Sequence, residues 1–406
     1  MSGVQTDSIE VAPRDGGGDL SRRDFLRRMG MIVPVAILAG SALPPFVAEG
    51  TRMSTGDTQI TDYLGRSIDV PQPDRLEHVA FLDESSELLS IALAPEIISG
   101  LMQSSSSEQA RSYFPPALGS TAVHPEISAD GTSKQWLEST NTQLILSLHT
   151  YGKNSEHTQL LDELQAYLGI PVICYGGHFD QIPNTLRRMG RLFGRGARSQ
   201  TAASYCQDVI DNLASVRARL SDDTAKRVLF VMDDKGTQAA SFKEPYAYSL
   251  HFAGALNAIP EPAEAENVGY ESNDATLIPG QNGYSVAEYA GLGMSPDFIV
   301  APPGFVEQLD KMRAGKDASS SLDSTLAEYY ASLDAVRSGA YRAVPMTPFN
   351  WLTDPNGVNC LLGMEWMCDL LYPELISLDM EQAVRDYFKN VFAVDLSDEQ
   401  VRALSL

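Results

Sequence analysis

Two histidines and a set of aromatic side chains stand directly after short apolar runs of the sequence. His149 follows the run LILSL, and His178 follows the run PVICY and two glycines. A neutral imidazole is the commonest protein ligand of a metal ion, so both residues are candidates for contact with a metal. Flat rings offer a large contact area at a small entropy cost, which suits a flat ligand. The aromatic candidates are Tyr151, Tyr246, Tyr248 and Trp351.

Plainer interpretations of the same residues remain open. A tyrosine in a loop is often a half-buried cover for its own part of the core. The chain has six histidines, and none of them is spaced as a metal-binding pair, which disfavours a bare metal ion as ligand. The sequence contains no Walker loop, G-x-S-x-G elbow, GxGxxG turn or H-E-x-x-H helix, so these motifs do not predict an enzyme.

Alternating strand and helix patterns must position these residues. The helical patterns are Ser85 to Leu93, with a serine cap, and Ser155 to Leu168, which Gly169 ends. Strands are predicted at 78–82, 96–101, 144–148 and 171–175, and again at 227–232, 297–301 and 342–346. This alternation predicts two Rossmann-like α/β lobes with mostly parallel sheets.

Ligands of open α/β sheets bind beyond the carboxyl ends of the strands, which is where the candidate residues stand. The same rule adds a second group of candidates. These are Asp83, Ser85, Gly176, Gly177, Asp233, Asp234 and Phe305.

A long amphipathic segment separates the two predicted lobes. Ala197 to Leu220 contains neither glycine nor proline, and its apolar residues recur at steps of four and three over about 36 Å of helix. These residues are Ala202, Cys206, Val209, Leu213, Val216 and Leu220. We therefore expect a single continuous helix between the lobes.

Composition sets further bounds. With 406 residues, of which 43% are hydrophobic, the chain is long enough for two lobes. The net charge is -23 and no basic block follows residue 28, which argues against nucleic acid as partner. The four cysteines lack CxxC spacing, and Cys360 and Cys368, about 12 Å apart along one predicted helix, cannot bridge each other.

The N-terminus carries an export signal. SRRDFLRRMG, Ser21 to Gly30, resembles the twin-arginine motif, and an uncharged run, Met29 to Ala48, follows. The sequence predicts export of the folded chain, with cleavage after Ala42 or Gly50, or retention of the run as an anchor. Because this route also carries cofactor-containing enzymes, such an enzyme remains a weaker alternative.

Five segments in the same order resemble one known family, the substrate-binding proteins of ABC importers for iron-siderophores and vitamin B12. The segments are TDYLGRSIDVPQPDRLEHVAFLDESSELL, the pair WLESTNTQLILSL and GLGMSPDFIVAPP, IPNTLRRMGRLFGR, SLHFAGALNAI, and FNWLTDPNGVNCLLGMEWMCDLLYPE. The last is the best match, although Thr353 to Gly357 stands where the family often has Asp-Arg-Pro-Pro-Ser, so an arginine is absent.

The resemblance implies a class III substrate-binding protein, whose two lobes are joined by one helix. The expected divisions are 1–50 for the signal, 58–196 and 222–406 for the lobes, and 197–221 for the helix. It implies an iron- or cobalt-containing chelate as ligand, such as a ferric siderophore, corrinoid or haem, with no covalent cofactor. Because SYFPP resembles the family's Y-x-P loop at the cleft, it also implies Tyr113 as a ligand contact. A bare metal ion, as in the related zinc and manganese importers, is the alternative.

The resemblance also implies a partner, an ABC permease in the membrane, to which a monomer docks through one exposed acidic residue on each lobe. Glu288 matches that position in the second lobe. In the first lobe the matching position is Gln135, and Glu138 and Glu126 are its acidic neighbours. We take Glu138 and Glu288 as the docking residues.

Two of the three tryptophans fall within Phe349 to Trp366. Trp366 lies among leucines in a predicted helix and is expected in the core. Trp351 precedes a turn and follows a predicted strand, so we expect its indole at the mouth of the cleft, as a wall for the ligand.

Overall fold

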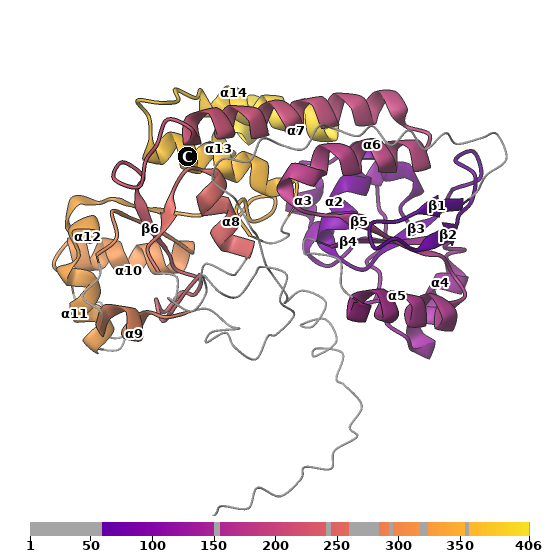
Figure 1. The fold of residues 1–406 in the computed structure, drawn as a ribbon, viewed down its shortest axis with the longest axis horizontal. Helices are drawn as coiled ribbons and strands as arrows, with labels where there is room; N and C mark the ends of the chain where they lie inside the picture. Colours follow the sequence, from indigo (N-terminus) through magenta and orange to yellow (C-terminus); the bar gives the residue numbers. More distant parts are fainter. Residues whose placement is uncertain are drawn as a thin grey trace, which may run out of the picture. The chain divides into compact units, whose positions relative to one another are not determined.

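Two parallel sheets organise the residues that the structure describes (Figure 1). The structure is a computed structural model, and it describes residues 59–149, 155–240, 245–259, 284–291, 295–316, 324–353 and 357–405. The predicted export signal lies outside these ranges. Within them, no helix has the length and apolar character needed to cross a bilayer.

The first sheet has the strand order β3-β4-β5, with all three strands parallel. Its strands are β3 (Val79–Phe81), β4 (Leu144–His149) and β5 (Val172–Gly176). Every residue in them is buried, as expected for apolar runs that are covered on both faces. The register pairs His149 with Gly176, so β4 and β5 end side by side. Three of the four predicted strands of this half are confirmed.

The predicted strand at 96–101 is wrong. Pro95 starts a short 3₁₀ helix, η1 (Pro95–Ile97), because proline fixes a helical φ and has no N–H for a strand ladder. Only single bridges remain, from Ile98 to Val79 and from Leu101 to Val123. An antiparallel pair, β1 (Gln59–Thr61) and β2 (Ser67–Asp69), precedes the first sheet in the sequence.

Helices follow the strands of the first sheet. The cap of α2 (Glu84–Leu93) is Asp83 and not a serine, since its carboxylate accepts from the N–H of Ser86. The structure confirms α5 (Ser155–Leu168), and Gly169 ends it at a φ of +72°. The remaining elements of this half are η2 (Ser104–Ser106), α3 (Glu108–Arg111), η3 (Pro116–Leu118), α4 (Gly131–Ser139), η4 (Phe179–Gln181) and α6 (Ile182–Leu192).

The second sheet has the strand order β11-β10-β6-β8 and is also parallel. Its strands are β6 (Arg227–Phe230), β8 (Leu256–Asn257), β10 (Phe298–Ala301) and β11 (Tyr341–Ala343). The predicted strands of this half are confirmed but shorter. A small antiparallel pair, β7 (Gln238–Ala239) and β9 (Tyr284–Ser285), accompanies it. Its helices are α8 (Pro245–Phe252), α9 (Val286–Gly291), α10 (Pro303–Arg313), α11 (Ser324–Ser332) and α12 (Asp334–Ser338).

Helix α7 (Gly196–Arg217) lies between the two sheets in the sequence, as predicted. Its apolar stripe is buried from Ala202 to Val216. Arg198, near its start, donates to the carbonyl of Ala92 at the end of α2 and to those of Asn390 and Val391. One side chain of α7 thus joins the helix that follows β3 to the C-terminal helices. Those are α13 (Asn359–Leu371), α14 (Met380–Tyr387), η7 (Phe388–Phe392) and α15 (Asp398–Leu404).

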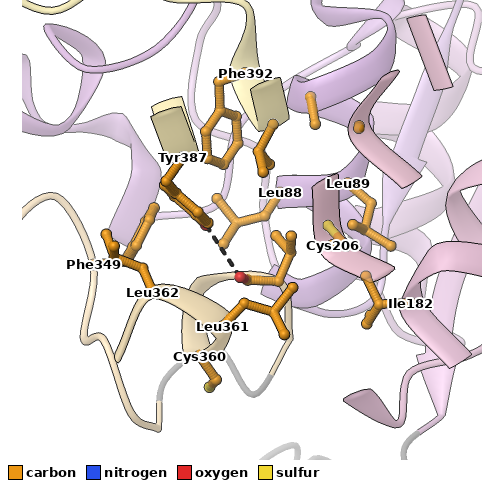
Figure 2. Close-up of a cluster of buried hydrophobic side chains, with 14 of the residues drawn as sticks. Leu88, Leu89, Ile182, Cys206, Phe349, Cys360, Leu361, Leu362, Tyr387 and Phe392 are labelled. Atoms are coloured by element: carbon orange, nitrogen blue, oxygen red, sulfur yellow. Dashed lines mark hydrogen bonds between the residues drawn. The ribbon is translucent and has the colours of Figure 1, made fainter. Parts of the chain in front are cut away.

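The C-terminal helices share one apolar core with α2 and α7 (Figure 2). Leu88 and Leu89 of α2 meet Cys206 of α7 and Phe392 in this cluster. The hydroxyl of Tyr387 donates to the carbonyl of Val358 at 3.2 Å, so the polar atom of this buried ring is satisfied. All four cysteines are free and buried, and α13 contains both Cys360 and Cys368.

The core corrects the interpretation of Trp351. Its indole is 0% exposed, and its Nε1 donates to the carbonyl of Thr347 at 2.9 Å. The backbone of Trp351 also presses against Gly363 of α13, where only a residue without Cβ fits. Trp351 is therefore a core residue, and its predicted place at the mouth of a cleft is wrong. Trp366 is 9% exposed and lies in the core as predicted.

Candidate functional site

Asp83 holds the carboxyl ends of β3 and β4 of the first sheet together. Its carboxylate accepts from the N–H of Ser86 at 2.7 Å and from the N–H of Leu148 at 2.8 Å. The first bond caps α2, and the second reaches the end of β4. Burial raises the pKa of Asp83 to about 6, against the lowering effect of these hydrogen bonds. Asp83 thus has a structural role at the edge where we predicted a ligand contact.

His149 is the last residue of β4, and its side chain is buried. Its ring stacks on that of His157 from α5, with centroids 4.1 Å apart and planes 14° from parallel. Burial, together with smaller effects of the neighbouring His149 and Arg66, lowers the pKa of His157 to about 3. The imidazole of His157 is therefore neutral at physiological pH. The stack places His149 within the wall of the edge.

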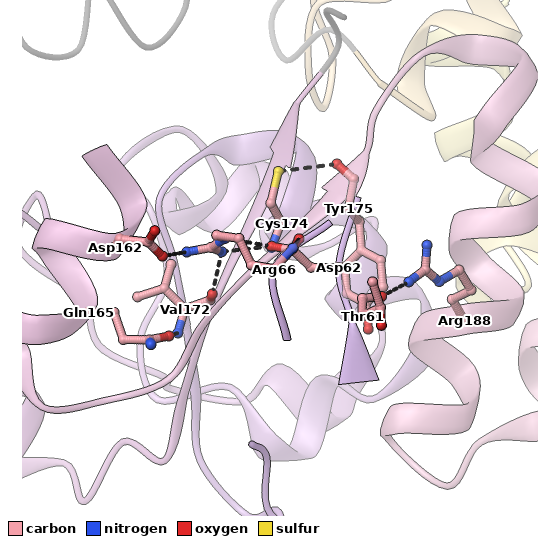
Figure 3. Close-up of polar contacts among 9 residues, drawn as sticks. All are labelled: Thr61, Asp62, Arg66, Asp162, Gln165, Val172, Cys174, Tyr175 and Arg188. Carbon is pink, nitrogen blue, oxygen red and sulfur yellow. Dashed lines mark hydrogen bonds and ion pairs between the residues drawn. The ribbon is translucent and has the colours of Figure 1, made fainter. Parts of the chain in front are cut away.

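A buried ion pair fixes β5 beside this edge (Figure 3). Arg66 binds Asp62 at 2.7 Å and donates to the carbonyl of Val172 at 2.6 Å. Asp62 in turn accepts from the N–H of Cys174 at 3.3 Å. Because both charges are buried and hydrogen-bonded, this network can define the register of the β1–β2 hairpin against β5. Arg188 of α6 also contacts this region, over the ring of Tyr175 at 5.4 Å.

His178 follows β5 and has a carboxylate partner. Its Nδ1 lies 2.5 Å from Oδ1 of Asp180. A carboxylate accepts hydrogen bonds, so Nδ1 carries the proton in this contact. An imidazole in this form can bind a metal or accept a hydrogen bond from a ligand. The side chain of His178 is 16% exposed.

Within the described part of the chain, two phenylalanine rings lie close to that of His178. Phe179 and Phe252 each lie with their ring centroids 6.0 Å from that of His178. Phe252 also meets Phe179 edge to face, at 5.5 Å and 88°, and His251 at 6.2 Å. Phe252 is the last residue of α8, which belongs to the second half of the chain. This aromatic group therefore joins the edge of the first sheet to α8.

Sequence reasoning missed Phe252. We sought ligand contacts directly after strands, and Phe252 ends a helix. The segment SLHFAGALNAI was noted for its resemblance, but nothing in its pattern singles out this ring. Phe252 is identified by its contact with His178 in the folded chain, and a single sequence does not reveal such a contact.

A second contact between the two halves involves Ser85 of α2. A Cβ added to Gly357 would lie 3.2 Å from the hydroxyl oxygen of Ser85. The backbone before α13 therefore comes close to the start of α2. Asn359 holds that backbone, since its side chain donates to the carbonyl of Asn350 at 2.6 Å and accepts from the N–H of Gly357 at 3.1 Å.

The other predicted ligand contacts fall in different places. Tyr113 is buried, with its ring 5.9 Å from that of Phe388, so it packs in the core. Phe305 is buried against Tyr330 at 4.8 Å. Asp233 accepts from the N–H of Thr237 at 2.8 Å and so closes a turn. These three residues serve the fold, which corrects the expectation that they face a ligand.

Three aromatic predictions are not resolved by these contacts. Tyr151 lies outside the described residues. Tyr246 and Tyr248 lie in α8, the helix that ends with Phe252. Of the predicted docking residues, Glu138 is exposed on α4, and Glu288 lies in α9. Among the residues that the structure describes, no group of three or more His, Cys, Asp or Glu side chains converges as a metal site.

Comparison with known proteins identifies the fold. No protein-family model and no curated protein matches the chain. Solved structures do match. An ABC transporter solute-binding protein from Sulfurospirillum deleyianum has a TM-score of 0.65 at 17% identity, over 86% of this chain and 98% of that one. A periplasmic solute-binding protein from Veillonella parvula has a TM-score of 0.63 at 15% identity, over 85% and 96% of the two chains.

A third match is the molybdate periplasmic binding protein MolA of Haemophilus influenzae, solved with molybdate. Its TM-score is 0.58 at 15% identity, over 84% of this chain and 99% of that chain. At such low identity these likenesses establish the fold, which is the mixed α/β fold of ABC transporter solute-binding proteins. The predicted fold class is therefore confirmed, while the predicted domain boundaries stay a prediction.

Proposed function

We propose that this chain is the extracytoplasmic solute-binding component of an ABC importer. It captures a metal chelate at the edge formed by the ends of β4 and β5 and delivers it to a membrane permease. The observation that carries this proposal is the His178–Asp180 pair, at 2.5 Å, directly after β5 in a solute-binding fold. That edge is where open α/β sheets bind their ligands.

The chemistry of the pair favours a metal-containing ligand. A carboxylate on Nδ1 orients the ring of His178, as carboxylates do behind metal-binding histidines, so that Nε2 can donate a lone pair. A chelate with an exchangeable coordination position can accept this lone pair. Phe252 offers a flat face to the organic part of such a ligand. A ferric siderophore, a corrinoid and haem all meet these conditions.

Export and docking complete the proposed role. The SRRDFLRRMG motif supports export by the twin-arginine route to the outer face of the cytoplasmic membrane. We assign docking on the permease to Glu138 of α4 and Glu288 of α9. A monomer suffices for this role, held at the membrane by the permease or by an uncleaved signal segment.

The test is a titration of the purified chain. Tryptophan fluorescence and visible absorption are recorded with cobalamin, haem, several ferric siderophores, molybdate, and Zn²⁺ or Mn²⁺ alone. We expect saturable binding of one chelate, with a shift of its absorption band. Saturation by molybdate or by a bare ion, and by no chelate, would overturn the chelate class. Turnover of a bound compound by ligand-free protein would overturn the binding role.

Variants locate the site in the same experiment. His178→Gln removes the proposed metal ligand, and Asp180→Asn removes the carboxylate behind it. We expect a loss of affinity of about 10- to 100-fold for Asp180→Asn and a larger loss for His178→Gln. His78→Gln is the matched control, because His78 precedes β3 and so lies at the other end of that strand. Equal affinities in all variants would place the ligand elsewhere.

A further inference from the structure

A lysine and a glutamate lie one turn apart on the exposed face of α4. Lys134 and Glu138 are both exposed, and residues four apart on a helix are neighbours whose opposite charges can pair. These two do not pair. Within the described part of the chain, the carboxylate of Glu138 has neither a hydrogen bond nor an ion pair. The question is what holds the ammonium of Lys134 away from it.

Tyr167, near the end of α5, engages the lysine. Nζ of Lys134 lies over its ring, 5.9 Å from the ring centroid, which is within the range of a cation–π contact. The Tyr167 side chain is 45% exposed, although a ring of this size would stabilise the fold more in the core. Core packing therefore does not explain the place of this ring. Glu163, one turn earlier in α5, is engaged elsewhere, since its carboxylate accepts from Nε2 of Gln159 at 2.7 Å.

Glu138 stands at an unfavourable place for the stability of α4. It is the last residue but one of the helix, which has no basic residue in its last turn. The carbonyl groups at a helix C-terminus carry a partial negative charge, so they repel a carboxylate there. Pairing with Lys134 would offset this repulsion, but the ammonium lies over Tyr167 instead. The carboxylate of Glu138 is thus both uncompensated and accessible.

We propose that Tyr167 holds Lys134 away from Glu138 and so keeps this carboxylate free for a positively charged group of the permease. This inference rests on the proposed assignment of Glu138 to docking, and it adds two residues that control the charge of that surface. A released ammonium beside Glu138 would compete for the carboxylate and would repel a cationic partner. Tyr167 is therefore a positioning residue of the docking surface.

The effect of each substitution follows from this arrangement. In Tyr167→Ala, Lys134 loses the ring and pairs with Glu138. An exposed pair at this spacing shifts an equilibrium by about 2-fold, so docking should weaken by about 2-fold. Tyr167→Phe keeps the aromatic face and should dock like the unmodified chain. The double variant Tyr167→Ala/Lys134→Ala lacks the competing ammonium and should regain normal docking.

The first test measures the position of Lys134 without any partner. Reductive methylation with isotope-labelled formaldehyde gives each lysine an NMR signal and keeps its charge. An aromatic ring shifts upfield the signal of a group that lies over its face. The Lys134 signal, assigned by its loss in Lys134→Arg, should be shifted upfield in the unmodified chain and in Tyr167→Phe. It should return to the ordinary lysine position in Tyr167→Ala, and the absence of this change would overturn the proposal.

The second test measures docking. The purified chain, loaded with the chelate that saturates it, is added at rising concentrations to membrane vesicles that contain the permease. We expect Tyr167→Ala to need about twice the concentration for half-maximal uptake, and the double variant with Lys134→Ala to need no more than the unmodified chain. Tyr167→Ala/Lys311→Ala is the matched control, because it removes an exposed lysine of α10 instead and should not restore docking.

The outcomes separate this inference from the proposed function. Normal docking of Tyr167→Ala would overturn the role of Tyr167. A weakening that Lys134→Ala does not reverse would overturn it as well, because the ring would then contact the permease itself. Normal docking of Glu138→Lys would defeat the docking assignment and this inference with it, even with Lys134 over the ring. Absence of chelate binding to the unmodified chain would defeat the proposed function.

Discussion

The carboxylate of Asp83 accepts a hydrogen bond of 2.8 Å from the backbone N–H of Leu148, and this bond joins the end of β3 to the end of β4. The next residue along β4 is His149, which pairs with Gly176 of β5. The Asp83 carboxylate thus joins β3 to β4, one of the two strands whose ends carry the candidate site.

Asp83→Asn should weaken this edge. The amide keeps one oxygen to cap α2, since asparagine is a good N-cap, but its NH₂ group then faces the N–H of Leu148. We expect the free energy of unfolding to fall by about 1–3 kcal/mol, measured by urea denaturation at pH 8. Asp379→Asn is the control, because Asp379 caps the exposed start of α14 through Gln382. Equal effects at both positions would contradict a special role for Asp83.

Glu365 of α13 predicts a pH dependence of stability. Burial raises its pKa from 4.5 to about 7; the nearby Asp386 raises it as well, and a hydrogen bond with Tyr205 of α7 opposes the shift. Between these two pH values the folded chain holds a proton that the unfolded chain has released. The contribution of protonated Glu365 to the stability of the fold is therefore fully present below pH 4.5 and is lost as the pH rises to about 7.

Glu365→Gln should remove this dependence. We expect the variant to gain thermal stability at pH 8 relative to the unmodified chain, with little gain at pH 5, in melts followed by circular dichroism. Glu328→Gln, on the exposed face of α11, is the matched control. A gain of the same size at both pH values would show that side-chain packing, and not proton binding, is responsible.

Trp351→Ala should lower the free energy of unfolding. Removing a fully buried indole costs about 3–5 kcal/mol, and Trp351→Phe should cost less because most of the volume remains. Urea denaturation measures both, with Trp136→Ala, a half-buried indole, as reference. Binding of the cognate chelate should survive in Trp351→Phe. A Trp351 variant that keeps normal stability but no longer binds the chelate would show that Trp351 contacts the ligand.

Charge reversal at the docking residues should separate transport from binding. Glu138→Lys and Glu288→Lys are expected to lower uptake of the chelate by cells at least about 10-fold while its affinity for the purified chain stays unchanged. Glu163→Lys, an exposed acidic residue on α5, is the control with the same change of net charge. If all three variants transport equally well, docking uses other residues.

Ligand binding should cause only a small closure of about a few degrees. Helix α7 is continuous over 22 residues, and Arg198 ties it to α2 and to the C-terminal helices, which makes it a stiff connection. Small-angle scattering with and without the cognate chelate should give nearly the same radius of gyration. A large decrease on binding would contradict a stiff connection.

Much of the fold was predictable because its local signals are strong. The runs LILSL and PVICY are entirely apolar, and they form strands buried on both faces. The stripe from Ala202 to Val216 repeats at helical spacing and is buried along its length. Where signals competed, the prediction failed: Pro95 converted a predicted strand into a 3₁₀ turn, and Asp83 took the cap that we assigned to serine.

The candidate site was less predictable, because it depends on contacts between distant segments. Proximity to a strand end nominated His178, which follows β5, yet it also nominated Trp351, which packs in the core. Phe252 reaches the site from a helix 74 residues away from His178 in the sequence. Strand-end rules state where a ligand can bind, and tertiary packing decides which side chains remain available there.

The composition of the serine run at Ser104 to Ser107 suggests a solvated loop. One residue of this run, however, makes a specific buried contact that restricts its substitution. The hydroxyl of Ser105 donates to the buried carboxylate of Glu87 at 2.5 Å. Ser107 caps α3, whereas Ser104 is exposed. In evolutionary terms, selection should preserve a hydroxyl at position 105 and a capping residue at 107 while position 104 varies. A tract that looks repetitive to the eye is thus expected to show sharply unequal rates of substitution at adjacent sites.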